Sequence, residues 1–425
     1  MTVYNVLCFF AAAAVFIALI NHKINGPQTS IAITAGAVIL SLLLVLAGQL
    51  AWLPLEAVAI KVVNEIDFES FLLQGILGFL LFAGGLGIKL SNMQDQKWEI
   101  TLLALVATLS STFIIGSGLY LVCQLVNFPL QYIYCLLFGA LISPTDPIAV
   151  LAIVKKLQAP QRISTQIEGE SLFNDGFGLV IFVTIFSIAF GQQQPDVGSV
   201  LGLFLREAIG GMLYGLLLSM LFHWLIAHTD DAAMEQLLTL LIPSAGYVLA
   251  ELLTVSGPLA MVVAGIFIGN ITYPRHFTQE SQQHLRHFWE LVDELLNGIL
   301  FLLIGLAMLT FAFHWQDWVL MVLAIPLVLA GRYLSVKLCY LGFQQVRRYN
   351  AMSVTILTWG GLRGGLAIAM AMSVPAGVMI VPDKHIDVKE ILLVMTYSVV
   401  LFSILIQGST ITPLIEKAKR LDSSG

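Results

Sequence analysis

Apolar stretches long enough to cross a bilayer recur along the whole chain, and they limit its fold more than any other feature. We expect thirteen of them, at about residues 3–20, 30–50, 68–88, 100–126, 131–154, 164–190, 198–226, 235–254, 257–270, 288–313, 317–342, 350–374 and 390–414. A helix can span a membrane because it satisfies its own backbone hydrogen bonds, and about 20 apolar residues are enough. No long polar stretch divides the 425 residues, and only 11% of them are charged. We therefore predict one all-α polytopic membrane domain (residues 1–425), and we exclude a large soluble protein, in which about 25% would be charged.

The positions of Lys and Arg predict how these spans are oriented. With the N-terminus outside, thirteen Lys and Arg residues fall in inner segments, whereas Lys61, Lys384 and Lys389 fall in outer loops. Inner loops of membrane proteins carry such an excess of positive residues. We therefore expect the N-terminus outside and the C-terminus in the cytoplasm. The polar stretch at 275–296 is expected to run along the inner interface before the tenth span, and the ninth span is expected to be short.

Residues 170–175, Glu-Ser-Leu-Phe-Asn-Asp, place several polar groups inside the sixth span. An Asp at the centre of a span costs roughly 2.5–3.5 kcal/mol in the free energy of membrane insertion. Such groups are therefore kept in a span only if they are paired, hydrated or functional. Ser171 and Asp175 are four residues apart and share a helix face, and Glu170 and Asn174 share the adjacent one. The first face offers hard oxygen ligands suited to a small cation. The second face is suited to holding neighbouring helices.

Two further spans are expected to be discontinuous. The fifth contains Ser-Pro-Thr-Asp-Pro at 143–147, and its two prolines remove backbone donors and clash with the preceding turn. The twelfth contains Gly-Gly-Leu-Arg-Gly-Gly at 360–365. Broken helices in two halves of a transporter point to a binding site near the midplane. The alternatives are a simple proline kink in the fifth span and close helix packing at the glycines of the twelfth.

The charged side chains of these three spans are expected to have different roles. Half-helix N-termini carry positive partial charge and C-termini negative, so Asp146 can neutralise facing N-termini and Arg363 facing C-termini. We expect Glu170 to pair with Arg363, since each is otherwise a lone buried charge. Asp175 is then the unpaired group that can exchange a proton for a metal ion. A structural, hydrogen-bonded acid is the alternative for Asp175.

The three motifs, in this order and in these spans, resemble those of the bacterial monovalent cation:proton antiporter-1 family, the sodium/proton exchangers. The resemblance covers essentially the whole chain. It implies the sodium/proton antiporter fold, with inverted repeats, two crossed discontinuous helices and a homodimer. Each protomer would contain a dimer-interface part (roughly 1–99 and 198–313) and a six-helix transport part (roughly 100–190 and 317–414).

The same resemblance implies roles for single residues at a cation- and proton-binding site. Asp175 resembles the carboxylate that proton and cation share. Ser171 and the backbone of Thr145 resemble further ligands of the transported Na⁺. Asn174 replaces the first Asp of the paired-aspartate, electrogenic relatives, so electroneutral one-for-one exchange is implied.

The comparison with the family gives one further agreement and one departure. Asp146 resembles the family's dipole-compensating acid at this site, and Glu170 with Arg363 resembles its buried ion pair. Many members, however, carry Glu after Phe in the third span, whereas this chain has Ala83. Without this acid, transport of K⁺ or of several monovalent cations becomes a stronger alternative to transport of Na⁺.

We therefore expect a secondary antiporter of the bacterial inner membrane that exchanges Na⁺, or Li⁺ or K⁺, for H⁺ by competition at Asp175. No P-loop is present, so ATP is not expected, and neither are enzymatic activity, a cofactor besides the transported ions, or a nucleic-acid partner. A K⁺/H⁺ antiporter of the same fold is one alternative. Alternatives from other classes are a channel and an intramembrane aspartyl protease that uses Asp146 and Asp175.

Overall fold

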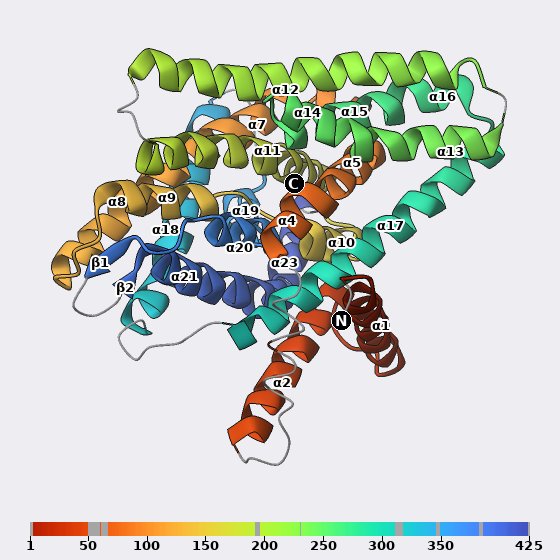
Figure 1. Cartoon of the computed structure of the whole chain (residues 1–425). Coiled ribbons are helices and arrows are strands. Elements are labelled where there is room, and N and C mark those ends of the chain that lie inside the picture. Colours follow the sequence, from red (N-terminus) through yellow and green to blue (C-terminus); the bar gives the residue numbers. More distant parts are fainter. Residues whose placement is uncertain are drawn as a thin grey trace.

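The computed structural model describes residues 3–49, 60, 67–191, 196–229, 231–310, 318–345, 349–381 and 386–423. Ten helices in these ranges are long and apolar enough to cross a membrane. Helix α1 and two pairs of shorter helices, α9 with α10 and α19 with α20, occupy the other three predicted spans, so the helix count is consistent with thirteen. Figure 1 shows their arrangement. Four residues used to predict orientation, Lys61, Arg347, Arg348 and Lys384, lie outside the described residues.

The first seven spans run from α1 to α12. They comprise α1 (Val3–Lys23), α2 (Thr29–Gln49), α4 (Phe68–Ser70) with η1 (Phe71–Ile76) and α5 (Leu77–Gly87), α7 (Lys97–Leu102) with η2 (Leu103–Ala107) and α8 (Thr108–Leu125), α9 (Tyr132–Ile142) with α10 (Ile148–Lys156), α11 (Gln161–Phe190) and α12 (Val197–Ile226). The short helix α6 (Leu90–Gln94) connects the third span to the fourth.

The remaining six spans run from α13 to α22. They comprise α13 (Ala232–Leu241) with η3 (Ile242–Gly246) and α14 (Tyr247–Leu252), α15 (Gly257–Phe267) with η4 (Ile268–Thr272) and α16 (Tyr273–His276), α17 (Gln279–Leu306) with η5 (Ala307–Thr310), α18 (Trp318–Phe343), α19 (Ser353–Trp359) with α20 (Gly365–Met372), and α21 (Val388–Phe402) with η8 (Ser403–Gln407) and α22 (Gly408–Thr410). A short antiparallel hairpin of β1 (Met379–Val381) and β2 (Ile386–Asp387) precedes α21, and α23 (Thr412–Ser423) follows α22.

Helix α17 and the ninth span differ from the sequence predictions. The ninth span is not short, because η4, a single wide turn, carries the helix on from Gly257 to His276. No separate interfacial helix precedes the tenth span. Instead α17 starts at a cap, where the Thr278 hydroxyl accepts from the Ser281 N–H (3.1 Å), and continues unbroken to Leu306. The polar half of α17 therefore belongs to a long helix, and part of it borders an internal cavity described below.

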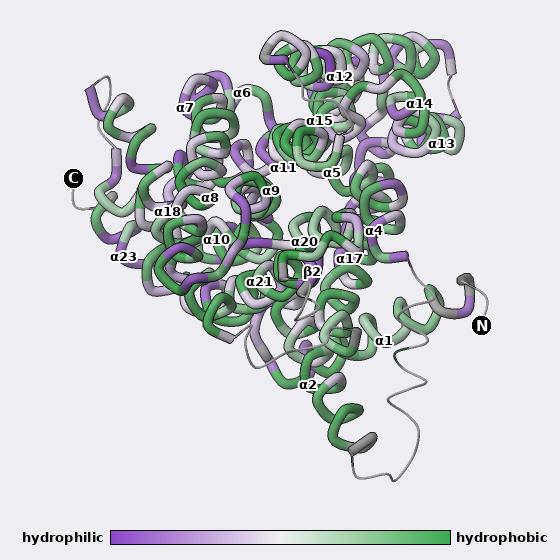
Figure 2. Tube along the Cα trace, turned by 60° about the vertical axis from the view of Figure 1, so that its left-hand side comes forward, coloured by the Kyte–Doolittle hydropathy of each residue, from purple (hydrophilic) through white to green (hydrophobic). Residues whose placement is uncertain are grey.

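The helices pack closely where both partners have glycine. A Cβ at Gly265 of α15 would collide with the Phe82 carbonyl of α5, and one at Gly85 would lie 2.8 Å from the Val262 carbonyl. Small residues permit this approach, which is typical of helices packed in membranes. Figure 1 shows α12 lying across α13 to α16, while α9, α10, α19 and α20 meet near the middle of the molecule. Hydrophobic residues predominate along the helices (Figure 2).

Candidate cation-binding site

The fifth span is broken between α9 and α10. Helix α9 ends at Ile142, and α10 begins at Ile148, directly after the second proline. Prolines cannot donate a backbone hydrogen bond, which explains why the helix ends here. The new N-terminus is capped from within the break, because the Asp146 carboxylate accepts a hydrogen bond from the Ile148 N–H (2.9 Å). Asp146 thus satisfies one of the free donors of α10.

The twelfth span is also broken, and the two breaks cross. Helix α19 ends at Trp359 and α20 begins at Gly365. At the crossing, the Asp146 N–H donates to the Leu362 carbonyl (2.8 Å), which forms an isolated antiparallel bridge. A Cβ at Gly364 would collide with the Asp146 carboxylate. Glycine at 364 therefore lets the N-terminus of α20 approach that carboxylate.

The charges at the crossing lie at helix ends of opposite partial charge. Asp146 lies at the N-termini of α10 and α20. Arg363 is 1% exposed, and its Nη1 donates to the carbonyls of Ser143 (2.7 Å) and Pro144 (2.9 Å), beyond the C-terminal end of α9. Carboxylates stabilise helix N-termini and cations stabilise C-termini. The structure thus brings Asp146 and Arg363 to the helix ends expected for them.

The polar residues of α11 meet the fifth span at Thr145. Asn174 is fully buried and makes two hydrogen bonds to this residue: its Oδ1 accepts from the Thr145 N–H (3.2 Å), and its Nδ2 donates to Oγ1 (2.8 Å). The Ser171 hydroxyl lies 3.1 Å from the same Oγ1. Since both groups of the Asn174 amide are engaged, this side chain holds the break in place.

Asp175 faces a cavity of about 1890 Å³. Apolar and polar residues of α1, α2, α5, α10, α11, α17, α20 and the break after α9 border the cavity, and its polar and small lining residues include Ala83, Asp146, Ser171, Asp175, Asp293, Asn297 and Gly364. Asp175 is half-buried, and it has no hydrogen bond or ion pair within the described ranges. Lys89, Lys155 and Lys156, all in segments predicted to be cytoplasmic, also border the cavity. The Asp175 carboxylate therefore shares one cavity with these residues.

Residues 10–417 match the model of the sodium/hydrogen exchanger transmembrane family. The chain belongs to this family. Among its curated relatives, the Na⁺/H⁺ antiporter NhaP of Pseudomonas aeruginosa is 39% identical over 97% of this chain and 96% of its own length. The Na⁺/H⁺ antiporter NhaH of Halobacillus dabanensis is 35% identical over 89% and 91%. The sodium proton antiporter MjNhaP1 of Methanocaldococcus jannaschii has the same fold, with a TM-score of 0.75 and 19% identity over 98% of this chain and 99% of its own.

One predicted contact of this exchanger is wrong. Glu170 does not pair with Arg363. Its Oε1 lies 2.5 Å from Nη1 of Arg332 on α18, and the two side chains are 1% and 3% exposed. The prediction assumed that Arg363 would otherwise be a lone charge, but the carbonyls of Ser143 and Pro144 already receive its guanidinium. Glu170 therefore pairs with Arg332, a residue that belongs to none of the three sequence motifs.

Three residues that support the second break had no predicted role at the site, although Arg332 was expected to pair with another helix. Arg332 Nη2 donates to the Leu357 carbonyl near the end of α19 (3.2 Å), and Gln407 Nε2 donates to the Trp359 carbonyl (2.9 Å). The Ser403 hydroxyl accepts from the Arg363 N–H (3.2 Å). A buried Gln in the last apolar span was the signal that could have drawn attention to this region.

Proposed function

We propose that this sodium/hydrogen exchanger moves one Na⁺ in exchange for one H⁺, without net charge transfer, by competition of the two ions for Asp175. One observation supports this most directly: Asp175 is the carboxylate beside the crossed breaks that faces the cavity without a hydrogen bond or ion pair from any described residue. Asp146 and Arg363 are already engaged with helix ends. A carboxylate must lose its proton to bind a metal ion, so each ion displaces the other.

We assign the remaining groups supporting roles. Ser171 borders the cavity beside Asp175 and, with the Thr145 backbone, supplies further oxygen ligands to Na⁺. Hard cations prefer such oxygen ligands. Asn174 carries no charge, which leaves one titrating acid for each transported cation. This is the basis for electroneutral exchange.

Lysines of segments predicted to be cytoplasmic border the cavity, so we assign the structure to an inward-facing state in the bacterial inner membrane, with the N-terminus outside. Movement of the transport part (roughly 100–190 and 317–414) against the dimer-interface part (roughly 1–99 and 198–313) would then expose Asp175 to the other side. The family resemblance supports a homodimer, which native mass spectrometry in detergent would test.

Dequenching of a pH-sensitive dye in everted vesicles tests the exchange itself, with Na⁺, Li⁺ and K⁺ compared at one pH. We expect Na⁺ and Li⁺ to give the signal. A signal from K⁺ alone would favour the K⁺/H⁺ alternative. The protease alternative has no support from the family match, and Asp146, which caps α10, is poorly placed to act as a free catalytic acid.

A further inference from the structure

The wall of the cavity formed by α17 carries carboxylates that the motifs did not predict. Glu290, Asp293 and Glu294 all border the cavity, and all three belong to the polar half of this helix. Glu290 and Glu294 are exposed, whereas Asp293 is half-buried. Acidic residues in a cavity attract cations but do not by themselves make a site. A second observation, at Asn297 one helical turn further along α17, points to a ligand.

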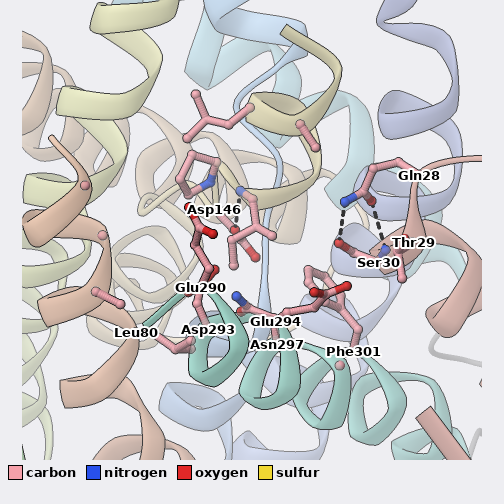
Figure 3. A pocket seen from close by; sticks show the side chains of 18 of the residues that line it. Gln28, Thr29, Ser30, Leu80, Asp146, Glu290, Asp293, Glu294, Asn297 and Phe301 are labelled. Atoms are coloured by element: carbon pink, nitrogen blue, oxygen red, sulfur yellow. Dashed lines mark hydrogen bonds between the residues drawn. The ribbon is translucent and has the colours of Figure 1, made fainter. Parts of the chain in front are cut away.

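Asn297 is 5% exposed, borders the same cavity, and has no hydrogen bond of ordinary distance and angle from any described group at either Oδ1 or Nδ2. Buried amides are nearly always hydrogen-bonded, so a pair of unsatisfied atoms requires an explanation. Asp293 is four residues earlier on the same helix face. Its carboxylate is close enough to interact with the amide, and Figure 3 shows both side chains rising from α17 toward Asp146. The two together offer a carboxylate oxygen and an amide oxygen to a ligand.

Electrostatic contacts connect this pair to the transport site. The Asp293 and Asp146 carboxylates repel each other, and so do those of Asp146 and Asp175. Each of these three acids borders the one continuous cavity. Lys155 also borders the cavity and attracts the Asp293 carboxylate. Beyond it, the acids from Asp293 to Asp175 provide a field of negative charge, which low-dielectric walls strengthen.

An aromatic contact also fixes the position of Asp293 relative to the third span. Trp289 of α17 packs on Phe82 of α5, with ring centroids 4.9 Å apart. This contact fixes α17 against the segment that contains Ala83, and Asp293 follows Trp289 by one helical turn. Both Ala83 and Asp293 border the cavity. Helix α17 thus brings a carboxylate to the wall of a cavity that α5 also borders.

We propose that Asp293 and Asn297 form a second, outer cation-binding station, which takes Na⁺ from the cytoplasmic side of the cavity before it reaches Asp175. The station rests on the proposed exchange at Asp175. Oxygen atoms of the carboxylate and of the amide contact the ion, and water completes its shell. Only two protein groups contact the ion, so the station is expected to bind weakly and to release its ion readily.

The experiment compares Asp293→Asn with Glu294→Gln, a matched control that removes the same charge from an exposed position on the same cavity wall. Exchange is measured in everted vesicles over a range of Na⁺ concentrations. We expect D293N to raise the half-saturating Na⁺ concentration about threefold to tenfold, with the maximal rate within about twofold of wild type. E294Q should change neither value by more than about twofold. Equal shifts in the two variants, or none in D293N, would overturn the station.

Two further variants keep the test decisive. Asn297→Ala removes the amide without changing charge and should raise the half-saturating concentration in the same direction, which a purely electrostatic role of Asp293 would not produce. If D293N is poorly folded, N297A decides alone: an unchanged half-saturating concentration overturns the station. Asp175→Asn separates the two proposals, since its retained exchange would refute the proposed function, whereas lost exchange in D175N with unchanged N297A refutes only the station.

Discussion

The ion pair between Glu170 and Arg332 gives the sharpest test of the packing around the site. Both side chains are almost fully buried, and the charged atoms lie 2.5 Å apart. Glu170→Gln leaves the Arg332 charge without its partner, which costs about 3–5 kcal/mol in the free energy of unfolding. Arg332→Met leaves a buried carboxylate and should cost a similar amount. It also removes the donor to the Leu357 carbonyl, worth about 1–3 kcal/mol.

The double variant separates pairing from independent roles. Once both charges are gone, only the loss at the Leu357 carbonyl remains, so E170Q/R332M should be destabilised by about 1–3 kcal/mol, well below the sum of the single variants. The carbonyl loss is common to R332M and the double variant, so the coupling energy should be about 6 kcal/mol or more. Denaturant unfolding in mixed micelles measures all four proteins. The control cycle, E170Q with Arg363→Met, should be closer to additive, because Arg363 bonds to carbonyls of the fifth span. Additivity in the Arg332 cycle, or equal coupling in both, would refute the pairing.

Three other outcomes follow from the site. Gly364→Ala should reduce the initial exchange rate at least about tenfold, because its Cβ collides with the Asp146 carboxylate, whereas Gly342→Ala, whose Cβ meets nothing within 4 Å, should exchange normally. Below the pKa of the shared carboxylate, the half-saturating Na⁺ concentration should rise about tenfold for each unit that the pH falls, and a flat profile would argue against competition. In proteoliposomes, a K⁺ diffusion potential imposed with valinomycin should leave the rate unchanged, and acceleration by the potential would contradict one-for-one exchange.

Much of the fold could be predicted because the bilayer imposes simple rules on sequence. Length and hydropathy located the spans, and the prolines at 144 and 147 located the first break, since proline cannot continue a helix. Helical spacing on α11 separated Ser171 and Asp175 from Glu170 and Asn174. In the structure Ser171 and Asp175 border the cavity, whereas Asn174 is fully buried against Thr145.

Contacts between distant spans could not be predicted in the same way. Which Arg meets Glu170 depends on how α11, α18 and the second break pack, and sequence spacing carries no information on that. Asp293 was missed for a different reason. The polar start of α17 has the pattern of a helix lying on the membrane surface, and a polar helix face that borders an internal cavity has the same pattern.

Proton release on cation binding tests the central role of Asp175 most directly. The purified exchanger is titrated with Na⁺ in weakly buffered detergent solution, near the pKa of the shared carboxylate, while a pH dye records released protons. We predict release of up to one proton for each Na⁺ bound, and none from Asp175→Asn. Proton release of the same size from the D175N variant, with its Na⁺ affinity intact, would contradict the account.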